Sequence, residues 1–166
     1  MQKISFNELI DNYSSVVLRM AARILGDTQQ AQDVHQEVFL EIWRRWHKYN
    51  GRTNWNAYLY RATVRSAIRF AKKARTSQHI SQQGDALANT SDPDENMRVA
   101  ELQRKLAESL AKLSKRQAEV FVLSRIEGLE HEKIAGLLGC SQKTIRVHLH
   151  RAAKQLAREL SDYLTD

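Results

Sequence analysis

The chain has 166 residues, which is enough for one domain of average size or two small ones. A hydrophobic fraction of 42% allows buried cores, but no apolar run reaches membrane-spanning length and the N-terminus lacks a secretory signal, so we expect a cytoplasmic protein without membrane insertion. The net charge of +7 favours a polyanionic partner, either nucleic acid or an acidic membrane surface.

Two helices are predicted within the first fifty residues. A capping-box pattern, Ser5-Phe6-Asn7-Glu8, starts the first, whose apolar residues follow at helical spacing until Gly26. Asp27 can cap a second helix that runs to about Lys48. Apolar residues cover a wide arc of this second helix, which is typical of a helix that is central in a bundle or that docks on a partner.

A strongly basic segment follows. Residues 44–75 contain ten Lys or Arg and no Asp or Glu, whereas the residues on both sides carry a net negative charge. Cations next to aromatic rings suit single-stranded DNA, because the cations neutralise phosphates and the rings stack on exposed bases. The alternative is that most of the rings belong to the core. The aromatic residues of this segment are Trp46, Tyr49, Trp55, Tyr58, Tyr60 and Phe70.

A third helix is predicted from Trp55 to about Ala74, after an Asn50-Gly51 turn and with Asn54 as its cap. Basic residues recur every three to four positions along it, at Arg61, Arg65, Arg69 and Lys72/Lys73, which aligns them on one face. Like charges at this spacing destabilise an isolated helix, and a bound polyanion would relieve the repulsion.

The remaining chain predicts a linker and a second helical domain. Residues 76–92 are polar and non-periodic, and Asp92-Pro93 then provides a cap and a first helical residue. Another capping-box pattern, Ser114 to Gln117, starts a helix that runs through Ile126. We therefore expect an all-α fold in which two small helical domains are joined by a flexible linker.

A helix-turn-helix is predicted from about Glu130 to Lys154. Ile134, Leu137 and Leu138 face inward on a short first helix, Gly139 suits a turn with positive φ, and Ser141 can cap the second helix. The exposed residues of the second helix suit contacts with base edges and phosphates in the major groove. Helical hairpins that bind no DNA can share this pattern. The proposed DNA-facing residues are Ser141, Gln142, Lys143, Thr144, Arg146, Val147, His148, His150 and Arg151.

The chain offers no constellation for catalysis, for a metal or for a cofactor. Cys140 has no second cysteine to pair with and is expected in the core, and His148 and His150 point to different helix faces. A glycine-rich phosphate loop and a nucleophile–base pair are also missing. An enzyme is therefore the least favoured class.

Taken together, these motifs resemble the extracytoplasmic-function (ECF) group of bacterial RNA polymerase sigma factors. Ala31-Gln-Asp-Val-His-Gln-Glu-Val-Phe-Leu-Glu-Ile-Trp43, which follows Arg23-Ile-Leu-Gly-Asp27, is similar to conserved region 2 of that family. Leu110-Ala-Lys-Leu-Ser-Lys-Arg-Gln117 and the helix-turn-helix resemble region 4. Two motifs in the family's order are far more specific than either alone.

The resemblance implies a role for each segment. Residues 1–75 would form the region 2 domain, 76–95 the linker and 96–166 the region 4 domain, whose helix-turn-helix would read the minus-thirty-five element. Core RNA polymerase and promoter DNA would be partners, together with an anti-sigma factor. The polymerase-binding residues would be Asp33, Gln36, Glu37, Leu40 and Trp43, and the residues that bind the minus-ten element would be Trp55, Tyr58, Arg61, Arg65, Arg69, Lys72 and Lys73.

The third helix departs from the family pattern. Arginines stand at 65 and 69, where the family commonly has Asn and Asp, and this favours phosphate contact over base-specific capture. Two other functions stay open: a helix-turn-helix regulator that acts without replacing sigma, and a non-catalytic adaptor that binds protein through the second helix. The region 2 signature argues against the first, because such regulators have no polymerase-docking helix.

Overall fold

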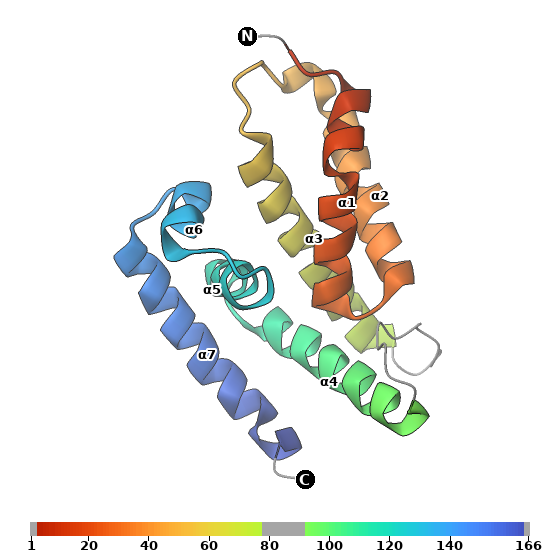
Figure 1. Ribbon diagram of the computed structural model, residues 1–166, viewed down its shortest axis with the longest axis vertical. Coiled ribbons are helices and arrows are strands. Elements are labelled where there is room, and N and C mark those ends of the chain that lie inside the picture. The colour runs from red at the N-terminus through yellow and green to blue at the C-terminus, as the bar shows by residue number, and fades with distance from the viewer. Residues whose placement is uncertain (1–2, 78–91, 165–166) are drawn as a thin grey trace.

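The computed structural model describes residues 3–77 and 92–164, and every regular element in these two stretches is helical (Figure 1). The prediction of an all-α fold is confirmed. None of the described helices is both long and apolar enough to cross a membrane. The elements are α1 (Phe6–Leu25), α2 (Thr28–Arg44), the short 3₁₀ helix η1 (Trp46–Lys48), α3 (Trp55–Ser77), α4 (Pro93–Lys112), α5 (Lys115–Phe121), the π-helical turn η2 (Val122–Ile126), α6 (His131–Leu138) and α7 (Gln142–Leu164).

The caps of the first two helices form as predicted. Ser5 Oγ accepts a hydrogen bond from Glu8 N (3.2 Å), and Glu8 Oε2 accepts one from Ser5 N (2.8 Å), which completes the capping box. Gly26 ends α1 with a φ of 67°, and Asp27 then accepts from two backbone N–H groups of α2. The second helix is shorter than expected, because the chain tightens into η1 after Arg44.

Helices α1, α2 and α3 lie side by side in the N-terminal half, residues 3–77 (Figure 1). Their apolar stripes meet in one core that excludes water from its largest side chains. The fully buried members include Leu9, Met20, Ile24, Val34, Ile42 and Val64.

The C-terminal half, residues 92–164, contains α4 to α7, and α6 and α7 form the predicted helix-turn-helix. Gly139 joins these two helices with a φ of 68°, and Ser141 Oγ caps α7 by accepting from Thr144 N at 3.1 Å. Leu123, Ile134 and Ile145 are fully buried between α6, α7 and η2. Cys140, expected in the core, is only half-buried at its edge.

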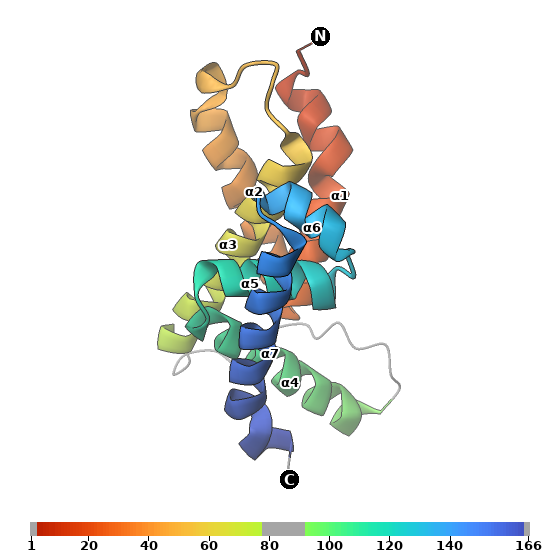
Figure 2. The same ribbon diagram turned by 90° about the vertical axis from the view of Figure 1, so that its left-hand side faces the viewer.

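The two halves pack against each other. Helix α3 contacts α4, α5 and α6, while α1 contacts α4 and η2 (Figure 2). One apolar core passes through both halves, because Leu110, Leu113 and Val122 join the core of the first three helices. Periodicity identifies an apolar helix face but not its partner, so the sequence predicted two tethered domains without this contact.

The linker predicted at 76–95 is partly helical at both ends. Helix α3 continues to Ser77, and α4 begins at Pro93 with the Asp92 side chain accepting from Asp94 N at 3.0 Å. Residues 78–91 lie outside the described residues.

Candidate nucleic-acid interface

Four of the residues predicted to bind polymerase form an exposed stripe on α2. Asp33, Gln36, Leu40 and Trp43 recur at helical spacing, and Leu40 and Trp43 are 42% and 56% exposed. The Trp43 ring contacts Phe6 of α1, with the ring centroids 4.8 Å apart. Large apolar side chains at the surface are typical of a protein-docking site. We call these four residues the docking stripe.

The fifth residue of that predicted set, Glu37, faces α3 instead. Its Oε2 accepts a hydrogen bond from Ser66 Oγ at 3.3 Å, and its Oε1 lies 3.4 Å from Arg69 Nη2. Glu37 therefore joins α2 to α3 and holds an arginine of the basic segment.

The aromatic residues around η1 and the start of α3 form one cluster. Trp46 and Trp55 stack with centroids 5.7 Å apart and an interplanar angle of 19°. Tyr49 Oη donates a hydrogen bond to Tyr58 Oη at 2.8 Å. Burial, and then this hydrogen bond, raise the pKa of Tyr49 well above its ordinary value. The ring contacts and this hydrogen bond join the aromatic side chains into one cluster.

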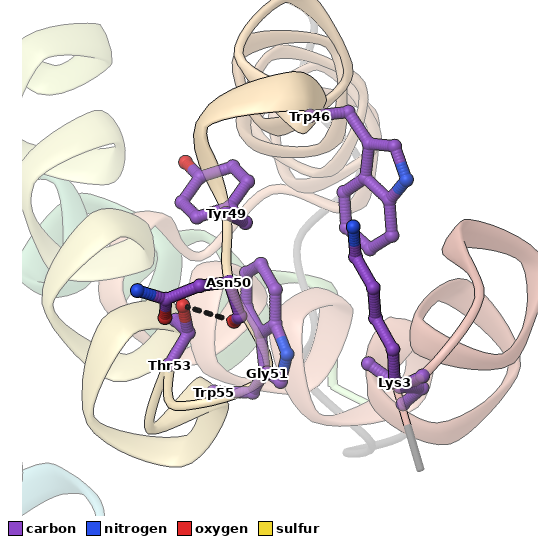
Figure 3. Close-up of a pocket in the computed structure, with 8 residues that line it drawn as sticks. Lys3, Trp46, Tyr49, Asn50, Gly51, Thr53 and Trp55 are labelled. Atoms are coloured by element: carbon purple, nitrogen blue, oxygen red, sulfur yellow. Dashed lines mark hydrogen bonds between the residues drawn. The ribbon is translucent and has the colours of Figure 1, made fainter. Parts of the chain in front are cut away.

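A pocket of about 170 Å³ opens beside this cluster (Figure 3). Trp46, Tyr49 and Trp55 form its aromatic walls, and Lys3 and Asn50 supply polar groups. Thr53 Oγ1 donates to Asn50 O at 3.3 Å, which fixes the loop between η1 and α3. Sequence reasoning missed Lys3, Asn50 and Thr53 as lining residues, since only the Asn50-Gly51 turn signalled this loop. We call this site the aromatic pocket.

The basic side chains of α3 meet carboxylates that the sequence pattern did not reveal. Arg65 Nε donates to Glu119 Oε1 of α5 at 2.9 Å, and Arg69 pairs with Glu37. Residues 44–75 contain no acidic residue, but acidic side chains of α2 and α5 lie next to this segment in the folded chain. Arg61 is half-buried, whereas Lys72 and Lys73 are exposed at the far end of α3.

The helix-turn-helix presents most of its predicted residues to solvent. Val147 is 39% exposed on this charged helix face. Ser141 and Thr144 instead stabilise the helix start, because their hydroxyl oxygens lie 2.9 Å apart. The other exposed residues of the predicted set are Gln142, Lys143, Arg146, His150 and Arg151.

His148 differs from the expectation of an outward side chain. It is half-buried, and its Nδ1 has no hydrogen-bond partner. Position 148 lies three residues after Ile145 and four before Ala152, both buried, so it borders the inner face of α7. Burial and the nearby charges of Arg116 and Arg151 lower the pKa of His148.

A second pocket, of about 260 Å³, lies beside α7. Its polar lining consists of Arg125, His131, Arg146 and His150, arranged around Leu149 and Ala153. Arg125 and His131 were not among the predicted residues, because they precede α7 in the chain. Four basic or titratable groups around one hollow suit an anion such as a phosphate. We call this site the cationic pocket.

Comparisons with known proteins match both halves. Residues 9–76 match the Sigma-70 region 2 family, and residues 103–156 match Sigma-70, region 4. RNA polymerase sigma-H factor of Pseudomonas aeruginosa is 25% identical over 174 residues, covering 99% of this chain and 90% of that protein. ECF RNA polymerase sigma factor SigE of Mycolicibacterium smegmatis is 27% identical over 98% of this chain and 64% of its own length.

Two solved structures share the fold. CnrH, in complex with the cytosolic domain of CnrY, has a TM-score of 0.53 and 26% identity, covering 95% of this chain and 88% of that one. The sigma factor RpoE from Bartonella quintana, in complex with the anti-sigma factor NepR, has a TM-score of 0.53 and 20% identity, covering 94% and 96%. Both likenesses extend through the two halves.

Proposed function

The chain belongs to the extracytoplasmic-function group of sigma-70 RNA polymerase sigma factors, and from this premise we propose which of its surfaces bind polymerase and which bind the promoter. A sigma factor binds core polymerase and directs it to promoters for transcription initiation, and it is not itself an enzyme. Residues 1–75 act as the domain for polymerase and the minus-ten element, 76–95 as the connection and 96–166 as the domain for the minus-thirty-five element. The protein works where polymerase works, in the cytoplasm.

The docking stripe is the polymerase-binding surface. Support comes from the exposure of Leu40 and Trp43 on a helix whose other apolar faces are buried. Exposed aromatic anchors carry much of the energy of protein interfaces. Asp33 and Gln36 then form the polar part of this interface, with Glu37 at its edge.

The aromatic pocket and the basic side chains of α3 bind the minus-ten element, and the pocket is the observation that carries the proposal. An unstacked base finds a planar ring to stack on, and Lys3, which lines the pocket, can neutralise a phosphate. Arg52, exposed between the lining residues Gly51 and Thr53, can neutralise another. Trp55 forms a wall of the pocket, and Tyr58 supports Tyr49 through their hydrogen bond. The basic residues that contact the DNA backbone along α3 are Arg61, Arg65, Arg69, Lys72 and Lys73.

Helix α7 reads the minus-thirty-five element. Gln142, Lys143 and Arg146 can donate to base edges in the major groove, and Val147 can contact a thymine methyl group. Ser141 and Thr144 form the helix start that approaches the DNA, and His148 lies behind the face that contacts it. Arg125, His131 and His150 of the cationic pocket, together with Arg151, hold the flanking phosphates.

An anti-sigma factor is a further proposed partner. CnrH, which shares the fold at 26% identity, is bound by the cytosolic domain of a second protein. The docking stripe and the face of α7 are the surfaces that such a partner would have to cover to keep this chain from polymerase and promoter.

Run-off transcription with purified core polymerase tests the proposal. The template is a promoter found by mapping transcript starts after overexpression of the chain. We expect a promoter-dependent transcript from the chain with core, and its loss when Trp43 is replaced by alanine. Tight binding to promoter duplex without any transcript would identify a regulator that does not replace sigma, and binding to core without either DNA element would identify an adaptor.

A further inference from the structure

The cationic pocket is built by three successive elements of the C-terminal half. Leu149, which is buried, and Ala153 form the apolar part of its lining. The volume of about 260 Å³ is far more than one water requires, so the pocket has room for a small molecule. Its basic residues are Arg125 of η2, His131 at the start of α6, and Arg146 and His150 one turn apart on α7.

Arg125 comes from an irregular turn. The helix that begins with α5 changes its hydrogen bonding at η2, where Glu127 N donates to Val122 O at 2.9 Å. This bond spans five residues instead of the four of an α-helix. Such π-helical turns are rare and are concentrated at functional sites. The chain therefore departs from regular helix in the element that supplies one of the two arginines of the pocket.

The basic side chains of the pocket have no acidic partner. Within residues 3–77 and 92–164, none of the four forms a hydrogen bond or an ion pair, and neither Glu130 nor Glu132, which flank His131 in the chain, lines the pocket. Basic groups gathered without a counter-charge repel one another, and a bound anion would relieve this repulsion. The arginines that do pair with carboxylates are Arg23, Arg45, Arg65, Arg69 and Arg116.

The charge of the lining indicates which kind of anion fits. The two guanidinium groups are always charged, and the two imidazoles can donate further hydrogen bonds to an anion. A backbone phosphate of DNA carries one negative charge, whereas a phosphate monoester carries about 1.5 to 2 at pH 7 and pyrophosphate carries more. Arg125 and Arg146 together therefore match a multiply charged phosphate better than a single phosphodiester.

We propose that the cationic pocket of the free chain binds a small anion with a phosphate monoester or pyrophosphate group, and that this anion competes with the minus-thirty-five element. Arg146 connects the two events, because it lines the pocket and is also the proposed donor to base edges. An anion held by Arg125 and Arg146 keeps Arg146 from the major groove. The anion site rests on the pocket alone, while the competition also rests on the proposed function.

Imidazole signals in nuclear magnetic resonance test the anion site without DNA. Pyrophosphate is added to the full chain at pH 7 and constant ionic strength. We expect the signals of His131 and His150 to shift and to saturate together. His47 is the internal control, because it is exposed next to Lys48 but lies outside the pocket, and its signal should not follow this curve.

A pair of variants tests which groups hold the anion. Arg125→Gln should weaken pyrophosphate binding by about tenfold or more, the usual effect of losing a hydrogen bond to a charged group. Lys154→Gln removes the same charge from an exposed site on α7 outside the pocket, and it should change the affinity by less than about twofold because salt screens distant charges. Circular dichroism checks that both variants fold.

Binding to the minus-thirty-five duplex tests the competition. Pyrophosphate at about ten times its dissociation constant should weaken duplex binding about tenfold, compared with sodium chloride at the same ionic strength. For Arg125→Gln, whose pyrophosphate dissociation constant is about tenfold higher, the same concentration should weaken duplex binding only about twofold.

The outcomes separate the claims. Equal shifts of the three imidazole signals would mean general charge screening, and a response to duplex without a response to pyrophosphate would mean that the pocket takes DNA alone; either result overturns the anion site. Saturable pyrophosphate binding with unchanged duplex affinity overturns the competition. Failure to bind any duplex, even with core polymerase present, counts against the proposed function, and the imidazole signals still decide the anion site.

Discussion

Trp43 is the single residue on which polymerase docking most depends. Its ring is 56% exposed and its inner side rests on Phe6, so it is held in place without being part of the core. Trp43→Ala should weaken core polymerase binding by about 2 kcal/mol or more, the range of interface hot spots, while thermal stability changes little. Titration of labelled protein with core polymerase measures this.

The matched control for that change is Gln32→Ala, at an exposed position on the same helix outside the docking stripe. It should leave polymerase affinity within experimental error. Equal losses in the two variants would mean that the stripe has no special role in docking.

His148 makes stability depend on pH. Burial, followed by Arg116 and Arg151, lowers its pKa in the folded chain, so the folded state favours the neutral imidazole. The stabilisation is complete above the unfolded pKa of about 6.5 and is lost as pH falls toward the lowered folded value. In urea unfolding, the free energy of unfolding should fall less between pH 7 and pH 5 for His148→Gln than for the unchanged chain. Equal losses would contradict this assignment.

Single residues also show where sequence reasoning succeeds. The caps at Ser5, Asp27 and Ser141 were predictable because each bonds to a backbone group two or three positions away. The partner of Arg65 was not predictable, since Glu119 lies 54 positions further along the chain. The aromatic pocket was half predicted: its rings were identified as a group, but Lys3 reaches them only through the packing of α1.

At the scale of elements, α3 acts mainly through charge. The affinity for single-stranded DNA should depend less steeply on salt when Arg65 and Arg69 are both replaced by alanine. The slope of log affinity against log salt should become less negative by roughly 0.7 for each phosphate that the chain no longer neutralises. Arg19→Ala, at an exposed site on α1, should leave the slope unchanged. A salt series of binding isotherms gives the slopes, and an unaltered slope in the double variant would mean that these arginines do not meet DNA.

Helix α7 acts through specific contacts. Arg146→Ala should weaken binding to the minus-thirty-five duplex by about 1–3 kcal/mol. It should also reduce the difference between the affinities of the chain for this duplex and for a scrambled one. Arg125→Ala, in the cationic pocket, should weaken both duplexes alike, because phosphates carry no sequence information. Competition binding with the two duplexes measures the contrast, and a uniform loss in both variants would remove Arg146 from base recognition.

The elements themselves were largely predictable, and their ends and neighbours less so. Periodicity gave the helices and the helix-turn-helix, but η1 shortened α2 and the side chain of His148 turned inward. Both differences arise from tertiary packing, because Trp46 is drawn into the aromatic cluster and His148 lies beside the buried face of α7. A helical repeat cannot resolve positions at the border of a face.

For the whole molecule, the sequence predicted the two helical halves but not the contact between them. Leu110 and Leu113 read as the core of a separate domain, yet they pack in the same cluster as the first three helices. Local spacing does not show which segment packs on an apolar helix face, because that depends on the long-range arrangement of the chain.

Gly26 offers a test of that contact that does not involve DNA. Its φ of 67° nearly equals the 68° of Gly139, so alanine at either position meets the same backbone strain of about 1–2 kcal/mol. A Cβ at Gly139 meets no atom within 4 Å, whereas at Gly26 it would lie 2.8 Å from Gln103 Cβ of α4. Gly26→Ala should therefore destabilise the chain more than Gly139→Ala in urea unfolding. Equal costs in the two variants would show that α4 does not approach Gly26 in solution.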